Sequence, residues 1–169
     1  MIDIVRTRAA CAGAATSYLL KKIAARAGAY APGFQDRMFA ELERLGDDLD
    51  AVERWFGRYR WEFSELGYRF IMRRVAFHTE GIVAWVEAGE GFRGAVLPTI
   101  GRVLYPDRDI DGGHAVALTA GPTNGKPQPK VTLIDPWPGI EPRPVPGTLE
   151  EARRDLKFSA LLCFWAGYS

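Results

Sequence analysis

Residues 11–27, CAGAATSYLLKKIAARA, decide how this chain folds. The segment is rich in alanine and other good helix formers, and Gly28 directly after it suits a helix C-terminus. Its first turns carry mostly small side chains, which is unusual for a helix exposed to solvent. We therefore predict a buried helix that packs closely against other elements on several sides.

Two further helices follow in the pattern of the sequence. Residues 35–45 place apolar side chains at helical spacing, which predicts an amphipathic helix. Another helix begins after Asp47 or Asp48, because either aspartate suits an N-cap and apolar residues recur at helical spacing behind it. Residues 61–71 fit a helix and a strand equally well, so both interpretations stay open there.

The character of the chain changes after Gly91. Before that point, residues 80–88 read as a helix with Thr79 as its candidate cap. After it come short apolar runs separated by turn-forming residues, which predict strands at residues 95–100, 115–120, 130–134 and 161–165.

Two connections and the overall layout complete this pattern. The stretch PTNGKPQP at 122–129 reads as a hairpin loop, and WPGIEPRPVPG at 137–147 reads as a surface connection. The layout predicts one α+β domain over residues 1–169, with helices first and an antiparallel sheet second.

Composition excludes several classes of function. The 169 residues are 47% hydrophobic and 25% charged, with a net charge of +1, so a polyanionic partner such as nucleic acid is not expected. No apolar run approaches the roughly 18 residues that span a bilayer, so no membrane insertion is expected. Cys11 and Cys163 are too few for a disulfide framework and have no zinc-ligand spacing. We expect neither a cofactor nor a metal, and the sequence says nothing about oligomeric state.

The N-terminal stretch is basic and resembles an organelle transit peptide in charge. Its cationic side chains are Arg6, Arg8, Lys21, Lys22 and Arg26, with Asp3 as the one acid among them. A secretory signal fits worse, because two lysines follow the apolar run directly. The expectation is therefore an unprocessed soluble protein that is cytoplasmic, or secreted without a conventional signal peptide.

Three residues are candidates for chemistry. Cys11 stands at the predicted N-terminus of the first helix, where the dipole and unpaired N–H groups stabilise a reactive thiolate. His114 opens a predicted strand after two glycines, in GGHAVAL. Asp135 ends another strand, in VTLIDPWP, and Pro136 interrupts the ladder directly after it. Each residue also has a purely structural interpretation: a buried small hydrophobe, a turn histidine and a turn aspartate.

One geometry uses all three residues. If a hairpin joins the two strands, the start of the first and the end of the second lie at the same edge of the sheet. Antiparallel pairing would therefore bring His114 and Asp135 together, where the carboxylate can orient the imidazole. The other histidine, His78, has no supporting pattern.

These motifs resemble the papain-like cysteine proteases. The cysteine at the start of a central helix, GGHAVAL and LIDPWPG are similar to the compact bacterial branches of that family, namely leader-cleaving peptidase domains of peptide exporters and secreted effector proteases. The resemblance implies a papain-like fold with a buried nucleophile helix, and a peptide or protein substrate. It also implies Cys11 as nucleophile, His114 as base and Asp135 as the residue that orients the base.

The chain departs from the family at the oxyanion hole. The family's glutamine lies shortly before the cysteine, where this chain has Val5 and Arg6, and the aromatic residue after the cysteine is replaced by Ala12. The side-chain amides lie elsewhere, at Gln35, Asn124 and Gln128. Losing one oxyanion donor costs about 2.7–4 kcal/mol of transition-state stabilisation. Either Arg6, Thr7 or the Cys11 backbone N–H supplies the donor, or the domain is a weakened or inactive relative.

Three hypotheses for function remain open at this stage. The first is a thiol hydrolase or acyltransferase that acts on an amide bond, and protease, deamidase and transglutaminase chemistry share this triad. The second is a binding domain on the same fold that holds a peptide without cutting it, which the missing glutamine favours. The third is an unrelated α+β domain in which Cys11 is a core residue.

Overall fold

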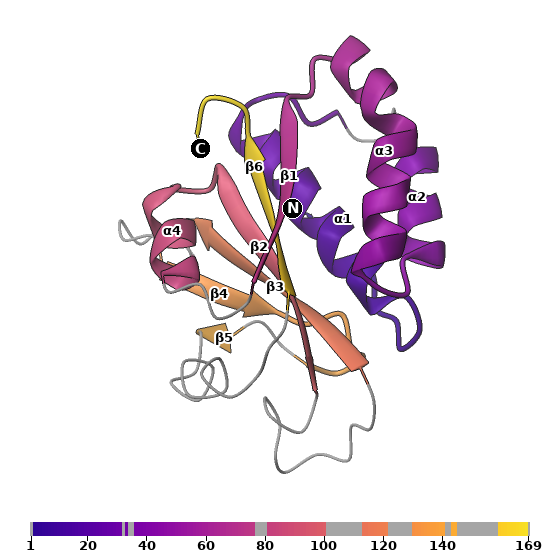
Figure 1. The fold of residues 1–169 in the computed structure, drawn as a ribbon, viewed down its shortest axis with the longest axis vertical. Coiled ribbons are helices and arrows are strands. Elements are labelled where there is room, and N and C mark those ends of the chain that lie inside the picture. Colours follow the sequence, from indigo (N-terminus) through magenta and orange to yellow (C-terminus); the bar gives the residue numbers. More distant parts are fainter. Residues whose placement is uncertain are drawn as a thin grey trace.

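The computed structural model describes residues 2–31, 33, 36–76, 81–100, 113–121, 130–140, 143–144 and 159–168. Within these residues the chain forms four helices and one antiparallel sheet of six strands (Figure 1). The helices are α1 (Cys11–Arg26), α2 (Asp36–Leu45), α3 (Leu49–Glu65) and α4 (Ile82–Ala88). The strands are β1 (Phe70–Ala76), β2 (Arg93–Ile100), β3 (Gly113–Gly121), β4 (Lys130–Ile134), β5 (Arg143–Pro144) and β6 (Ser159–Trp165). The α+β class predicted from the sequence is confirmed.

The strands lie in the order β1-β6-β2-β3-β4-β5, and every neighbouring pair is antiparallel. The pairing predicted between the runs at 115–120 and 130–134 is confirmed: β3 and β4 are neighbours, with Ala117 opposite Ile134 and Gly121 opposite Lys130. The loop expected at 122–129 lies outside the described residues. The register places the start of β3 and the end of β4 at the same edge of the sheet.

Helices cover both faces of the sheet (Figure 1). The sheet residues Ala115, Ala117 and Ile134 share a core with α1, α2 and α3, and this core continues into β6. Val116 and Leu118, which alternate with those alanines along β3, pack into a second core beneath α4. The alternation of β3 therefore assigns one set of side chains to each helical layer.

Helix α1 is buried along most of its length, as its small residues predicted. The first turn approaches the corner between α2 and α3 closely enough for Gly13 to donate its N–H to the carbonyl of Gly46 at 2.8 Å. A Cβ atom on Gly13 would stand 2.0 Å from the carbonyl oxygen of Leu42, so only glycine fits there. Glycine at this position lets the helix start lie directly against the neighbouring backbone.

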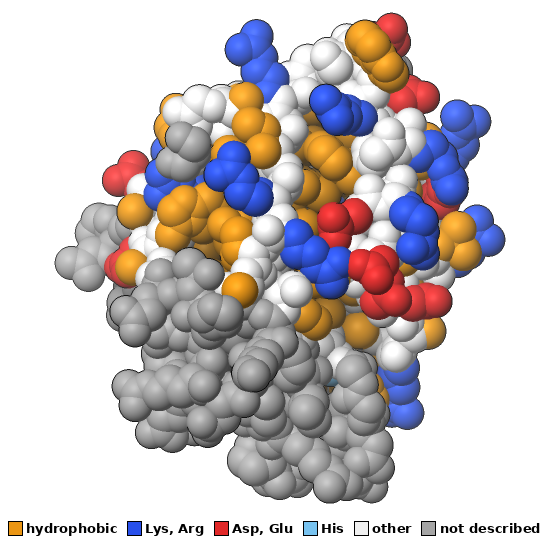
Figure 2. Space-filling view, in the orientation of Figure 1, with side chains coloured by type: hydrophobic (Ala, Val, Ile, Leu, Met, Phe, Trp, Pro, Cys, Tyr) orange, Lys and Arg blue, Asp and Glu red, His pale blue; other side chains and the backbone are white. Residues whose placement is uncertain are grey.

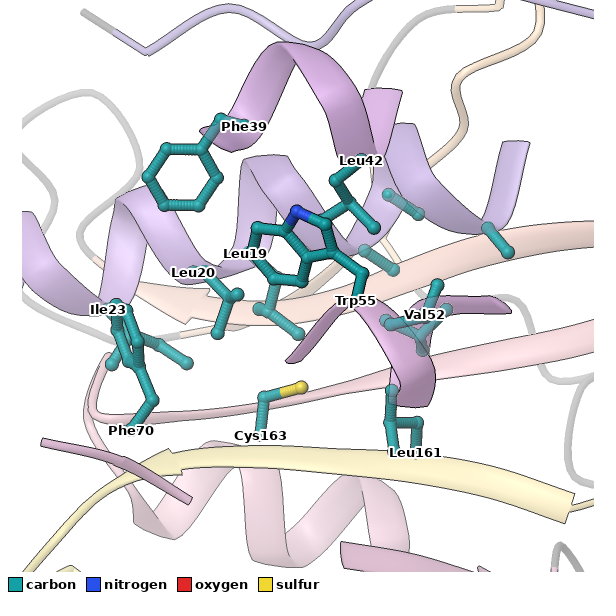
Figure 3. Packing of buried hydrophobic residues seen from close by; sticks show 14 of the residues in the cluster. Leu19, Leu20, Ile23, Phe39, Leu42, Val52, Trp55, Phe70, Leu161 and Cys163 are labelled. Carbon is teal, nitrogen blue, oxygen red and sulfur yellow. The ribbon is translucent and has the colours of Figure 1, made fainter. Parts of the chain in front are cut away.

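Large side chains fill the core between α1, α3 and the sheet (Figure 3). Trp55 packs at 5.4 Å from Phe63 in an edge-on arrangement, and its indole N–H donates to the carbonyl of Met38 at 2.9 Å. Cys163 on β6 is fully buried in this cluster. Burial raises the pKa of the Cys163 thiol, so this side chain acts as a small apolar residue.

The outer surface of α2 and α3 mixes both signs of charge (Figure 2). Lys21 of α1 pairs with Glu43 at 2.9 Å, and Arg74 of β1 pairs with Glu53 at 2.7 Å. Arg58 pairs with Glu41 while 62% of its side chain stays exposed. The Arg58 and Arg74 pairs are partly exposed and contribute little to stability, as on the solvated helix face expected from the sequence, whereas Lys21 and Glu43 are mostly buried.

Several details of the sequence prediction were wrong. The layout of helices first and sheet second does not hold, because β1 precedes α4 and pairs with the C-terminal β6. Residues 61–71, which the sequence left open, divide between the end of α3 and the start of β1. Helix α4 begins at Ile82 with Gly81 as its N-cap, while Thr79 lies outside the described residues. The proline-rich segment is more than a connection, since β5 within it pairs with β4.

No helix among the described residues is both long and apolar enough to cross a membrane.

Candidate functional site

His114 and Asp135 meet at the edge of the sheet where β3 begins and β4 ends. His114 is the second residue of β3, and Asp135 follows the last residue of β4 directly. The imidazole Nε2 lies 2.8 Å from Asp135 Oδ1, and the two residues are 3% and 1% exposed. The sequence prediction that a strand start and a strand end would bring these two side chains together is confirmed.

The Asp135 carboxylate is held by the loop that follows it. Its Oδ1 atom also accepts a hydrogen bond from the backbone N–H of Trp137 at 2.8 Å, which forms an Asx turn. The Trp137 ring packs edge-on against the His114 ring, with centroids 5.5 Å apart at 82°. The half-buried indole therefore shields the histidine–aspartate hydrogen bond from one side.

Cys11 is the second polar partner of His114. Burial by itself lowers the pKa of His114, but hydrogen bonds to Asp135 and to Cys11, with the charges of both groups, outweigh it and raise that pKa to about 9. At neutral pH the ring is therefore an imidazolium, with the Asp135 carboxylate and Cys11 as its neighbours. Asp135 occupies Nε2, which leaves Nδ1 as the nitrogen that can serve Cys11.

Cys11 and His114 each stand at the start of an element, α1 and β3. His114 shares the alternation of Val116 and Leu118, whose side chains pack beneath α4, whereas Ala115 and Ala117 face α1. Cys11 is the first residue of α1 and belongs to the core on the α1 side, and His114 is the second residue of β3. The thiol is 6% exposed there.

The two side chains proposed as oxyanion donors are engaged with other groups. Arg6 Nη1 donates to the carbonyls of Asp135, Trp137 and Ile140 at 2.9, 3.2 and 2.6 Å. Thr7 Oγ1 accepts from the N–H groups of Ala9 and Ala10 at 3.1 and 3.4 Å. Both residues thus bind backbone, either of the loop after Asp135 or of the segment before the helix.

Backbone donors remain at the start of α1. Gly13 N–H donates to Gly46 and Ala14 N–H donates to Ala10, both at the first turn. The N–H groups of Cys11 and Ala12 make no hydrogen bond to another described residue. Unpaired N–H groups at a helix N-terminus attract negative charge, so these two are the donors available beside the thiol.

Sequence reasoning missed the importance of the segment before Cys11. Thr7 N–H donates to the carbonyl of Pro136 at 2.9 Å, and the Arg8 guanidinium lies 5.3 Å from the Trp137 ring centroid. The basic residues of this stretch therefore contact the Asp135 loop. Their spacing contains no signal for this contact, because it joins segments that are far apart in the sequence.

The remaining candidates stand apart from this site. Cys163 is fully buried in the core shown in Figure 3, and burial alone accounts for its raised pKa. His78 lies outside the described residues. Among the residues that the structure describes, no group of three or more His, Cys, Asp and Glu side chains is arranged to hold a metal ion.

Comparisons of the chain with protein families, with curated proteins and with solved structures found no match.

Proposed function

We propose that this chain is a thiol-dependent hydrolase or acyltransferase that acts on a peptide or amide bond, built on a papain-like fold. Cys11 is the nucleophile, His114 exchanges the proton and Asp135 orients the ring. One observation carries the proposal: His114 Nε2 lies 2.8 Å from the Asp135 carboxylate, and Asp135 and Cys11 together raise the pKa of the ring.

This arrangement suits a thiol nucleophile better than a structural cysteine. A charged imidazolium stabilises a neighbouring thiolate, and the thiolate is the reactive form of cysteine. The start of α1 adds the positive end of the helix dipole at the same sulfur. A core cysteine such as Cys163 has burial alone around it.

The reaction follows from these positions. The Cys11 sulfur forms a bond to the carbonyl carbon, and the π electron pair moves to the carbonyl oxygen. When that pair returns, the C–N bond breaks and His114 gives its proton to the leaving nitrogen, which leaves a thioester on Cys11. Water, or an amine in an acyltransferase, gives a proton to His114, attacks the thioester and releases Cys11 as thiolate beside an imidazolium.

The negative oxygen needs a donor that the family's glutamine does not supply in this chain. The N–H groups of Cys11 and Ala12 take this role, because they lie at the helix start and bond no other described residue. Arg6 Nη1 already donates to three loop carbonyls, which favours the backbone donors for this role.

A second candidate is a binding domain on the same fold that holds a peptide without cutting it. The observation in its favour is that Arg6 Nη1 and Thr7 Oγ1 both bond to backbone groups. Such a domain would keep the hydrogen bond between His114 and Asp135 as a structural feature.

Covalent trapping separates the two candidates. A panel of peptidyl vinyl sulfones that differ in the residue before the electrophile would be incubated with the wild type and with Cys11→Ala, His114→Ala and Cys163→Ala. We expect one adduct by intact mass on the wild type and on Cys163→Ala, none on Cys11→Ala and at least tenfold slower labelling of His114→Ala. Labelling of the His114→Ala variant at the wild-type rate would count against the enzyme.

A further inference from the structure

Arg6 joins the N-terminal segment to the loop that follows Asp135. Its Nη1 atom reaches three carbonyls of that loop, at Asp135, Trp137 and Ile140. Thr7, the next residue, adds a backbone bond to the carbonyl of Pro136. Four loop carbonyls between residues 135 and 140 are thus held by two adjacent residues of the N-terminal segment.

The same segment leads directly into Cys11. The loop carries Asp135 at one end, and its Trp137 N–H fixes the carboxylate oxygen that bonds His114. We infer that Arg6 is a positioning residue, which fastens the Asp135 loop to the segment that precedes Cys11 and so sets carboxylate and thiol on the two sides of the His114 ring. This inference rests on the proposed function, but its test measures the titration of His114 and needs no enzymatic activity.

The chemistry of the loop explains why an arginine serves here. Pro136 and Pro138 have no N–H group, so the loop has few donors of its own with which to bond its carbonyls. A guanidinium carries several donors in one rigid plane and stays charged at every accessible pH. All three bonds run from one nitrogen, Nη1, which the planar guanidinium holds in place, whereas a lysine ammonium would bring its charge on a flexible stem.

An electrostatic effect and a positioning effect have opposite signs at His114. Removing a nearby positive charge favours the imidazolium and raises the pKa of the ring. Loosening the loop weakens the hydrogen bond from Asp135, which lowers the same pKa toward its ordinary value. Among the described residues, the titratable groups that act on the ring are Asp135 and Cys11, so the titration of His114 reports on this geometry.

The experiment is an NMR titration of the histidine Cε1–H signals in the wild type, Arg6→Met, Arg6→Lys and Arg8→Met. The chain has two histidines, and His78→Gln assigns their signals. We expect Arg6→Met to lower the His114 pKa by about one unit or more, and Arg6→Lys to restore part of the difference. Arg8→Met loses the same charge and a contact with the Trp137 ring of the same loop, but no hydrogen bond to a loop carbonyl, so its His114 pKa should stay level or rise.

A double variant tests whether Arg6 acts through the carboxylate. In an Asp135→Asn background, Arg6→Met should lower the His114 pKa no further, because the bond that it maintains is already lost. A further drop there, or an Arg6→Met protein that titrates like Arg8→Met, overturns the inference. If Arg6→Met does not fold, Arg6→Lys decides, since an unchanged His114 pKa in that variant overturns it too. Failure of the wild type to form a covalent adduct would remove the proposed function and leave this titration result standing.

Discussion

The N–H of Gly13 donates to the carbonyl of Gly46 at 2.8 Å, so the first turn of α1 is joined to the corner between α2 and α3. A Cβ atom on Gly46 would stand 2.4 Å from the Cα atom of Gly13. Gly13 is two residues beyond Cys11, which begins the helix. This backbone contact therefore sets where the helix start lies, and with it the thiol.

We expect Gly46→Ala to destabilise the protein by about 1–3 kcal/mol, because the added methyl group forces two backbones apart. Urea unfolding followed by circular dichroism measures the difference. Gly57→Ala is the matched control, since that glycine lies on the exposed side of α3 and a Cβ atom added there would meet no atom within 4 Å. The control should gain about 0.5–1 kcal/mol from helix propensity. Equal stability of the two variants would contradict the close contact.

Sequence periodicity was sufficient for the elements that bury one face, and insufficient where burial comes from distant partners. The alanine-rich segment and the runs at 115–120 and 130–134 predicted α1, β3 and β4, because their side chains alternate or crowd in a recognisable pattern. Strand β1 was not recognised, since its sequence FIMRRVA carries two adjacent arginines and its apolar residues pack only when β6 arrives from the C-terminus. Long-range pairing of that kind leaves no local trace.

The contacts of the candidate site, too, could be predicted only in part from the sequence. His114 and Asp135 could be paired from the sequence, because a hairpin and the strand period dictate which ends meet. The contacts of Arg6 could not, because they cross 129 to 134 residues and depend on carbonyl directions in the Asp135 loop. Whether Arg6 serves as an oxyanion donor therefore stayed open in the sequence.

The raised pKa of His114 predicts how stability depends on pH. The folded ring titrates near 9 and the unfolded ring near 6.5, so the folded state holds the extra proton between these values. Its contribution is fully present below about pH 6.5 and is lost as the pH rises through about 9. We expect the free energy of unfolding of the wild type, relative to His114→Gln, to fall by about 1–3 kcal/mol across this window.

Urea titrations at half-unit steps from pH 6 to 10 measure that difference. Subtracting the His114→Gln curve removes the contribution of groups that both proteins share. Asp135→Asn should flatten the wild-type curve, because the hydrogen bond that raises the pKa is weakened. A wild-type stability that rises between pH 6.5 and 9 relative to His114→Gln would contradict this assignment.

The two cysteines should differ sharply in reactivity. Cys11 stands at a helix start with an imidazolium beside it, whereas Cys163 is fully buried among apolar side chains. We expect iodoacetamide at pH 6.5 to modify Cys11 at least tenfold faster than Cys163, since only the thiolate reacts and only accessible sulfur is reached. Peptide mass spectrometry after timed quenching measures both rates in one sample. Preferential modification of Cys163 would reverse the choice of nucleophile.

The last prediction concerns what each member of the triad contributes. Cys11→Ala should abolish adduct formation with the vinyl sulfone panel and change the free energy of unfolding by less than about 1 kcal/mol, because it removes only one sulfur atom from the buried start of α1. Asp135→Asn should slow labelling without abolishing it, since the amide disturbs the orientation and tautomer of His114 but leaves the thiol and ring in place.

Both quantities are measured on the same protein preparations, adduct formation by intact mass and stability by urea unfolding, with Cys163→Ala as the control that keeps only the proposed nucleophile. A Cys11→Ala variant destabilised by more than about 2 kcal/mol, beside a wild type that never forms the adduct, would mark Cys11 as a core residue that fills space at the start of α1. The opposite pattern, a labelled wild type and a stable unreactive Cys11→Ala, separates the chemistry of the thiol from its packing, because a residue that only fills space cannot be removed without loss of stability.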